Sequence, residues 1–266
     1  MGLVDSHCHL PLISKSPEGM DKIVSAAKNE GVEHILSVSV DLETSNDVLE
    51  SAKRYLNVSA SVGVHPNCGP ENSEPSSDIL IELGSNEKII AIGETGLDFF
   101  FEDFDVERQI RQLKAHISAA RELKKPLIVH CREAAQTLLP ILKSEKADEI
   151  GGIMHCFVDN WDVASEAIDL GFLISFSGIV TFKNAENLRE VARKIPNDKI
   201  LIETDAPWLA PVPNRGKKNQ PAFVSHTARL LSQLRNQDFK EFSQQTSLNF
   251  YNLFRLKRAC SNQIDH

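Results

Sequence analysis

An aspartate and two histidines stand two positions apart in the segment VDSHCHL, which covers residues 4–10. Alternate side chains of an extended strand point to the same side, so Asp5, His7 and His9 are expected to share one face. Neutral imidazole binds divalent transition metals, and a nearby carboxylate offsets the charge of the ion. The spacing predicts a metal site at the end of this strand, with Asp5 as a supporting acid.

Further histidines and carboxylates follow other short apolar segments. The complete set of candidate metal ligands is His7, His9, Glu94, His130, His155 and Asp205. Six ligands exceed the four of a closed zinc site, but they suffice for two cations that share a carboxylate. The predicted arrangement places His7, His9 and Asp205 on one cation, His130 and His155 on the other, and Glu94 between them. Four histidines favour Zn²⁺, although Mg²⁺ and Mn²⁺ also serve phosphoryl chemistry.

These ligands need a scaffold that brings distant segments together, and the apolar pattern indicates one. Eight short apolar segments are predicted strands, at 2–9, 33–40, 58–64, 88–94, 126–131, 151–156, 171–176 and 199–205. Predicted helices cover 17–30, 44–56, 76–87, 103–124, 133–145, 160–170, 184–195, 222–235 and 238–254. Alternating strands and helices form a parallel sheet, and eight such units form an α/β (β/α)8 TIM barrel. The alternative is a doubly wound open sheet, whose dinucleotide-binding version carries a G-x-G-x-x-G sequence.

Each candidate ligand falls at the carboxyl end of its predicted strand. On the fourth strand, Glu94 is expected to share a face with Ile90 and Ile92. On the eighth strand, Glu203 and Asp205 are expected to share a face with Leu201. The carboxyl ends of the strands form the mouth of a (β/α)8 barrel, where active sites lie. The strands therefore carry polar tips because those tips line a site.

The composition is that of an ordinary globular protein with an acidic balance. The chain has 266 residues, 41% of them hydrophobic, and a formal net charge of −8. Length alone suits one large domain or two small ones, and the eight-unit barrel predicts a single domain over residues 1–266. Because the balance is acidic, a nucleic-acid ligand would need a local cationic site. Five cysteines indicate a reducing compartment. No signal peptide or membrane span is evident, so we expect an intracellular protein, cytoplasmic or nuclear, with no obligate protein partner.

Several longer motifs resemble the TatD family of metal-dependent deoxyribonucleases, which have amidohydrolase-like barrels. The resemblance covers nearly the whole chain, in order, through DSHCH (5–9), GVHP (63–66), IGETGLDF (92–99), MHCF (154–157), SFSG (175–178), ETDAPWLAP (203–211) and RGKKNQP (215–221). Related hydrolases often carry a carboxylated lysine on the fourth strand. This chain has Glu94 there instead, as TatD-like proteins do. Asn67 departs from the family, in which a histidine often follows this proline.

The resemblance implies a divalent-metal-dependent deoxyribonuclease that hydrolyses DNA phosphodiesters. A pair of metals can clamp a phosphate and activate a water, with Asp205 as general base and Glu203 as an orienting carboxylate. A small cationic mouth on an acidic body favours single-stranded ends or abasic sites. We therefore expect a 3′ exonuclease, an abasic-site endonuclease, or both.

Four further residues are candidates for contacts with the DNA substrate. His65 ends the third predicted strand, and Arg132 follows His130 with a guanidinium suited to phosphate. Arg215 and Lys217 lie in the loop after the eighth strand and are candidates for backbone phosphates. Lys124 and Lys125 precede the fifth strand, so they are expected at the opposite end of the barrel.

Two other readings of the same residues stay open. The barrel and its ligands would equally serve a metal-dependent hydrolase of small-molecule amides, lactones or phosphate esters, because a fold does not determine a reaction. The second alternative is a non-catalytic scaffold that keeps the barrel. The intact set of six ligands argues against this alternative.

Overall fold

Eight parallel strands form one sheet in the computed structural model, which describes residues 2–69, 74–100 and 105–257. The strands are β1 (Leu3–Cys8), β2 (Val32–Ser37), β3 (Val58–Val62), β4 (Ile89–Asp98), β5 (Leu127–Arg132), β6 (Gly152–Met154), β7 (Phe172–Phe176) and β8 (Ile200–Ile202). They pair in the order of the sequence. The eight predicted strands are therefore confirmed, although their lengths differ.

The sheet closes on itself through the segment that follows β8. Cys8 forms a parallel bridge with Ala206. The backbone amide of Asp205 donates to the carbonyl of His7 over 2.9 Å, and that of His9 donates to Ala206 over 2.8 Å. These bonds join the two edges of the sheet, so the fold is the predicted (β/α)8 barrel and the open sheet is excluded.

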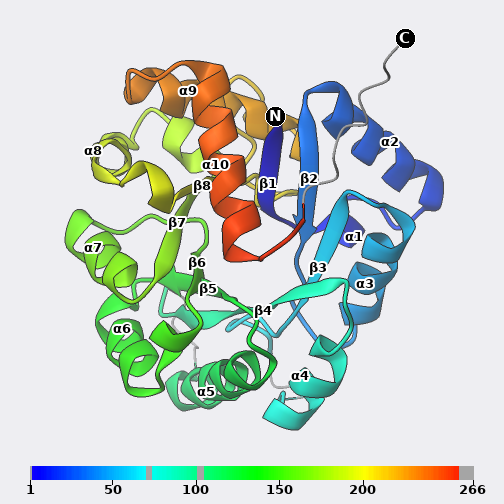
Figure 1. The fold of residues 1–266 in the computed structure, drawn as a ribbon, viewed down its shortest axis with the longest axis vertical. Coiled ribbons are helices and arrows are strands. Elements are labelled where there is room, and N and C mark those ends of the chain that lie inside the picture. Colours follow the sequence, from blue (N-terminus) through cyan, green and yellow to red (C-terminus); the bar gives the residue numbers. More distant parts are fainter. Residues whose placement is uncertain (1, 70–73, 101–104, 258–266) are drawn as a thin grey trace.

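Helices surround the barrel on its outer side (Figure 1). They are α1 (Leu10–Ile13), α2 (Pro17–Asn29), α3 (Ser45–Arg54), α4 (Ser77–Gly84), α5 (Val106–Leu123), α6 (Ala135–Ser144), α7 (Trp161–Asp169), α8 (Glu186–Lys194), α9 (Val224–Leu234) and α10 (Phe239–Leu253). The predicted start of the fourth helix at 103 lies outside the described residues, and α5 follows the N-cap Asp105. None of the described helices is long and apolar enough to span a bilayer.

Apolar side chains fill the barrel, and α10 closes its N-terminal end. An inner cluster takes residues from seven of the strands, namely Val4, Leu36, Ile90, Ala91, Ile128, Ile153, Leu173 and Leu201. Phe250 and Phe254 of α10 pack against this cluster, and the helix lies across the barrel end in Figure 1. A filled interior leaves only the carboxyl ends of the strands free for chemistry.

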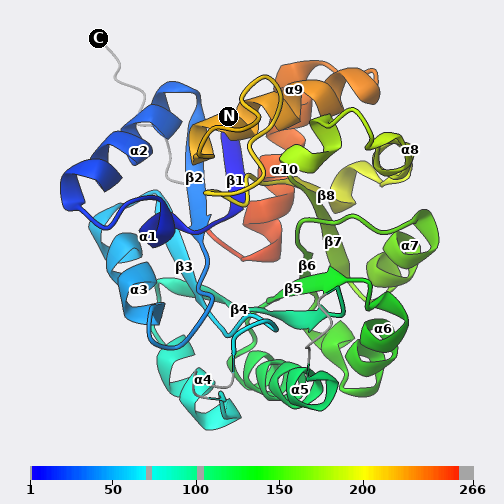
Figure 2. The same cartoon turned by 180° about the vertical axis from the view of Figure 1, so that it is seen from behind.

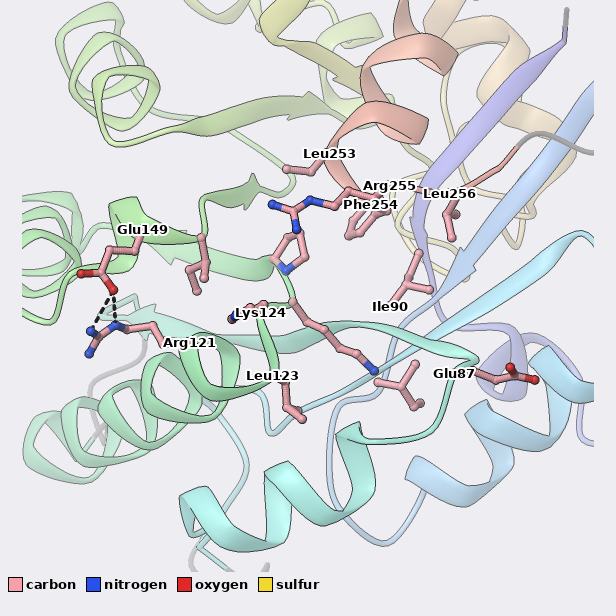
Figure 3. Close-up of a pocket in the computed structure, with 14 residues that line it drawn as sticks. Glu87, Ile90, Arg121, Leu123, Lys124, Glu149, Leu253, Phe254, Arg255 and Leu256 are labelled. Atoms are coloured by element: carbon pink, nitrogen blue, oxygen red, sulfur yellow. Dashed lines mark hydrogen bonds and ion pairs between the residues drawn. The ribbon is translucent and has the colours of Figure 1, made fainter.

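A hollow of about 470 Å³ lies beside α10 at this closed end (Figure 3). Lys124, Lys125, Phe254 and Arg255 are among its lining residues. Lys125 donates to the carbonyls of Gly84 and Asn86, so its ammonium supports the backbone. The prediction that both lysines lie opposite the mouth is confirmed.

The predicted alternation of β1 is wrong, although both of its histidines reach the mouth. Val4 packs in the inner cluster, and Ser6 contacts Ser175 across the barrel at 2.9 Å. Asp5 therefore points outward, where Thr204 donates to it from both its amide and its hydroxyl. A register irregularity between Asp5 and Cys8 then turns the strand, as β-bulges do, and His7 points inward.

Strand β4 breaks the predicted alternation in the same way. Ile90 packs in the inner cluster, whereas Ile92 packs in the outer cluster, beneath the helices. Register irregularities flank both residues, between Ala60 and Ser61 on β3 and between Ile92 and Thr95 on β4. Glu94 thus reaches the mouth through a distorted strand and does not share a face with both isoleucines.

Two buried histidines away from the mouth predict a dependence of stability on pH. Burial, with the nearby charge of Lys88, lowers the pKa of His34 to about 4, and burial lowers that of His116 to about 4. Between pH 6.5 and 4 the unfolded chain then binds more protons than the folded one. We expect the unfolding free energy to fall by about 3 kcal/mol for each histidine as the pH is lowered from 6.5 to 4.

Denaturant titrations at pH 7.0, 5.5 and 4.5 measure this effect. Replacing His34→Gln leaves a neutral polar side chain within reach of the Ser59 hydroxyl, which lies 2.9 Å from the imidazole. The slope of stability against pH should become shallower in this variant. An unchanged slope would show that His34 titrates normally in the folded protein.

Candidate metal centre and active site

The six candidate ligands meet at the open mouth of the barrel. A pocket of about 810 Å³ lies there, and His9, Glu94, His130, His155 and Asp205 line it. His7 is fully buried behind them. Strands β6 and β8 end earlier than predicted, so His155 and Asp205 stand on the turns that follow. The convergence expected from the sequence is present.

Glu94 occupies the centre of this group and is 2% exposed. Its Oε2 lies 3.4 Å from Nε2 of His7 and 3.8 Å from Nε2 of His9. Its Oε1 lies 2.6 Å from Nε2 of His155 and 3.2 Å from Nδ1 of His130. Each carboxylate oxygen thus faces a different pair of imidazoles, which is the geometry of a bridging ligand.

Asp205 completes the first of these two groups. Its Oδ1 lies 3.4 Å from Nε2 of His9 and 3.7 Å from Nε2 of His7. The residue has a left-handed backbone with φ of 56°, and its amide bond to the His7 carbonyl holds it beside β1. These distances place Asp205 beside the first pair of histidines, and the ring of His7 also stacks 3.9 Å from that of His155.

His65 lies within the second group. Its Nε2 is 3.4 Å from Oε1 of Glu94, and His65, Glu94 and His130 together could hold a metal ion. From the sequence, His65 is predicted to be a substrate contact. The structure adds that its ring reaches the same carboxylate oxygen as the predicted ligands.

The orientations of the imidazoles suit a cation. His9 donates from Nδ1 to the carbonyl of Val38 over 2.9 Å, so the neutral ring carries a lone pair on Nε2. That atom lies 3.1 Å from Nε2 of His7. Nδ1 of His130 and Nε2 of His155 approach to 3.3 Å. Where both facing nitrogens of a pair are unprotonated, their lone pairs could bind one divalent ion.

Two carboxylates hold the second pair of histidines from behind. Oε1 of Glu203 lies 3.3 Å from Nδ1 of His155 and accepts from the amide of Cys156. Oδ2 of Asp98 lies 3.0 Å from Nε2 of His130. A histidine ligand usually donates its other N–H to a carboxylate, which fixes the ring and its tautomer. Glu203 is thus placed to hold the ring of His155, and Asp98 is placed to hold that of His130.

Sequence reasoning missed Asp98, although the signal is visible. Glu94, Gly96 and Asp98 alternate along β4, which continues four residues beyond its predicted end. Asn67, the residue that departs from the family pattern, donates to Asp98 from its side-chain amide over 2.7 Å. Gly96 has φ of 141°, and a Cβ there would lie 1.9 Å from the carbonyl oxygen of His130. A glycine thus permits the close contact of β4 with β5.

Three carboxylates of the site, those of Glu94, Asp98 and Asp205, have lowered pKa values. Burial raises the pKa of Glu94, but His155, His65 and His130 outweigh it and hold that pKa well below its usual range. Burial likewise opposes the effect of His130 on Asp98, whose pKa is nevertheless lowered to about 2. The pKa of Asp205 is lowered in the same way, by a hydrogen bond from His9 and by nearby imidazoles. Ionised carboxylates are the form that binds a cation.

The four predicted substrate residues divide into two groups. His65 and Arg132 line the pocket, and the Arg132 guanidinium lies 3.4 Å above the ring of Phe100. Arg215 and Lys217 are outside the lining residues. The guanidinium of Arg215 stacks 3.9 Å from the Phe182 ring, and the ammonium of Lys217 lies 3.4 Å from Oδ1 of Asn214.

Replacing Asp98→Asn tests the support of His130. The variant keeps the shape of the side chain but loses its charge, so His130 should lose its fixed tautomer. We expect metal affinity or hydrolytic activity to fall about 10- to 100-fold, measured by competition with a chelating dye. Asp148→Asn, an exposed change at the closed end, should leave the affinity unaltered. Equal affinities in both variants would remove Asp98 from the site.

Comparison with known families and proteins agrees with this geometry. The family model described as TatD related DNase matches residues 4–255. The chain is 42% identical over 258 residues to an uncharacterized metal-dependent hydrolase, YcfH, of Escherichia coli K12, with 96% of this chain and 97% of that protein covered. It is 33% identical over 242 residues to a protein of Erwinia tasmaniensis named 3'-5' ssDNA/RNA exonuclease TatD, covering 89% and 93%.

Solved structures share the barrel. The crystal structure of the TatD homologue YjjV from Escherichia coli K12 is 28% identical and has a TM-score of 0.86, with 96% of this chain and 98% of that chain covered. An uncharacterized amidohydrolase from Saccharomyces cerevisiae has a TM-score of 0.81 at 16% identity, covering 95% and 99%. At that identity the likeness concerns the fold alone.

Proposed function

Because this chain belongs to the TatD family of metal-dependent hydrolases, we propose that it is a deoxyribonuclease that cleaves DNA phosphodiesters. The observation that carries the proposal is Glu94 at the centre of the imidazoles, with one oxygen toward each pair. The name of the Erwinia relative, 3'-5' ssDNA/RNA exonuclease TatD, supports the reaction class. We propose the same class here, with abasic sites as further substrates.

Two divalent cations per chain fit the donor set. His7, His9 and Asp205 would hold one of them, His130 and His155 the other, and Glu94 would contact both. Four imidazoles favour Zn²⁺, and Mg²⁺ or Mn²⁺ are the alternatives. When bound, such ions supply positive charge for a phosphate and lower the pKa of water.

The side chains of the mouth then divide the remaining work. Asp205, ionised and open to the pocket, accepts the proton of the attacking water through a carboxylate oxygen. The water oxygen bonds to phosphorus as the bond from phosphorus to the leaving oxygen breaks, and the proton passes on to that oxygen. Glu203 keeps His155 in position during the reaction, since its Oε1 is tied to the amide of Cys156.

Arg132 would supply a guanidinium to the reacting phosphate. It lines the pocket beside His130, and stacking on Phe100 fixes the plane of its donors. Planar guanidinium pairs well with phosphate oxygens. Arg215 and Lys217, which lie outside the pocket lining, would contact phosphates farther along the strand.

Cleavage of end-labelled oligonucleotides tests the proposed function. The purified protein, loaded with Zn²⁺, Mn²⁺ or Mg²⁺, is incubated with single-stranded DNA, with abasic duplex and with intact duplex. We expect cleavage of the first two, loss of cleavage on chelation, and recovery when the ion is returned. The His7→Ala variant should be inactive. Hydrolysis of lactones or small phosphate esters without cleavage of any DNA would instead assign the site to small molecules.

A further inference from the structure

Part of the lining of the mouth is apolar, and some of it is exposed. Leu12, Val40, Val158, Ile179, Trp208 and Leu209 line the same pocket as the metal-binding side chains. The indole of Trp208 is 50% exposed and the side chain of Val158 is 43% exposed. Exposed apolar surface that is concentrated at a site indicates a ligand with an apolar face. The reacting group is polar, so this apolar lining serves another part of the substrate.

The backbone of Trp208 is held firmly although its ring is exposed. Its amide donates to the carbonyl of Asp205 over 3.0 Å. The side-chain amide of Asn219, which is fully buried, donates to the carbonyls of Trp208 and Thr204 over 2.6 and 2.8 Å. This segment follows β8 and runs beside the end of β1 (Figure 2). The indole is therefore a positioned surface and not the tip of a loose loop.

Trp208 is also next to the metal-binding side chains. Its ring centroid lies 5.3 Å from that of His9, with an interplanar angle of 66°. His9 and Trp208 line the same pocket. A nucleotide whose phosphate sits at the histidines would thus have its own base, or that of its neighbour, within reach of the indole.

We propose that Trp208 stacks on a nucleobase of the strand being cleaved, an inference that rests on the proposed nuclease function. Bases of every type stack on aromatic side chains, so the contact is tolerant of sequence. A base inside a duplex is already stacked on both faces, whereas a base in a single strand or beside a lesion is free to turn out. The indole thereby selects single-stranded, terminal and unpaired nucleotides.

Intrinsic fluorescence provides a test that does not depend on hydrolysis. The chain has two tryptophans, and Trp161 begins α7 on the outside of the barrel. In a Trp161→Phe background, only Trp208 emits. The probes are a phosphorothioate-linked oligothymidylate, which resists cleavage, and a phosphorothioate oligomer of the same length that carries abasic residues only.

We expect the oligothymidylate to quench Trp208 and to bind about 10-fold or more tightly than the abasic oligomer, as stacking contacts do. In the protein that keeps Trp161, the Trp208→Ala variant should lose the preference in affinity for the oligothymidylate. The Trp208→Phe variant should keep most of that preference. Equal quenching and equal affinity for the two oligomers would overturn the stacking proposal. If the same preparation still cleaves DNA, the nuclease function survives; if it neither binds nor cleaves DNA, both fail.

Discussion

The Glu94→Gln variant should lose at least about 1,000-fold in hydrolytic activity, which corresponds to about 4 kcal/mol. Glu94 has five histidines within 3.8 Å of its carboxylate oxygens: His7, His9, His65, His130 and His155. Glutamine removes the negative charge between them and presents an amide group to one pair. We expect bound metal, measured by mass spectrometry of the purified protein, to fall together with activity.

A matched change elsewhere controls for the substitution itself. Glu33→Gln alters a glutamate that accepts from the amide of Gly2 at the other end of the barrel, and it should keep its metal and its activity. The melting temperature of each variant separates loss of the site from loss of the fold. A Glu94→Gln protein that is folded, binds the normal amount of metal and remains active would contradict the bridging role.

The Asp205→Asn variant should lose about 100- to 10,000-fold in kcat, the usual contribution of a general base. Asparagine keeps an oxygen near His9 and His7, so the metal content should change much less than in Glu94→Gln. It cannot accept a proton near neutral pH. Affinity for an uncleavable oligonucleotide should therefore remain within a few-fold of the wild-type value while turnover is lost.

Asp159→Asn is the comparison for this experiment. Asp159 is a partly buried aspartate that does not line the pocket. Its replacement should leave kcat within a few-fold of the wild-type value. If Asp205→Asn retained more than a tenth of the normal turnover, the proton would be accepted by another group.

Sequence patterns were sufficient to place the barrel and the candidate ligands at its mouth. Strand segments such as 126–131 carry an apolar run followed by His130, so their polar ends mark the mouth directly. The same reasoning was wrong about side-chain direction in β1. Asp5 does not share a face with His7, because the strand changes register between Asp5 and Cys8. This irregularity arises in the pairing of β1 with β2. The alternation of polar and apolar residues within β1 alone does not reveal it.

The contacts behind the ligands were harder to predict for a related reason. Asp98 lies four residues past the predicted end of the fourth strand at Glu94, because the apolar pattern ends before the strand does. Its role follows from the pairing of Asp98 with Arg132 in the β4–β5 register, which brings it beside His130. Similarly, the pairing of Asp205 with β1 depends on closure of the barrel, a contact across about 200 residues that no local motif contains.

Metal stoichiometry combined with cleavage tests the central claim most directly. Chelated protein is titrated with Zn²⁺ and, separately, with Mn²⁺ in a calorimeter, and single-stranded DNA cleavage is followed at each ratio of metal to protein. The proposed centre predicts about two ions per chain and activity that rises as the second site fills. Protein that binds neither ion, or that cleaves DNA equally well without them, would contradict it.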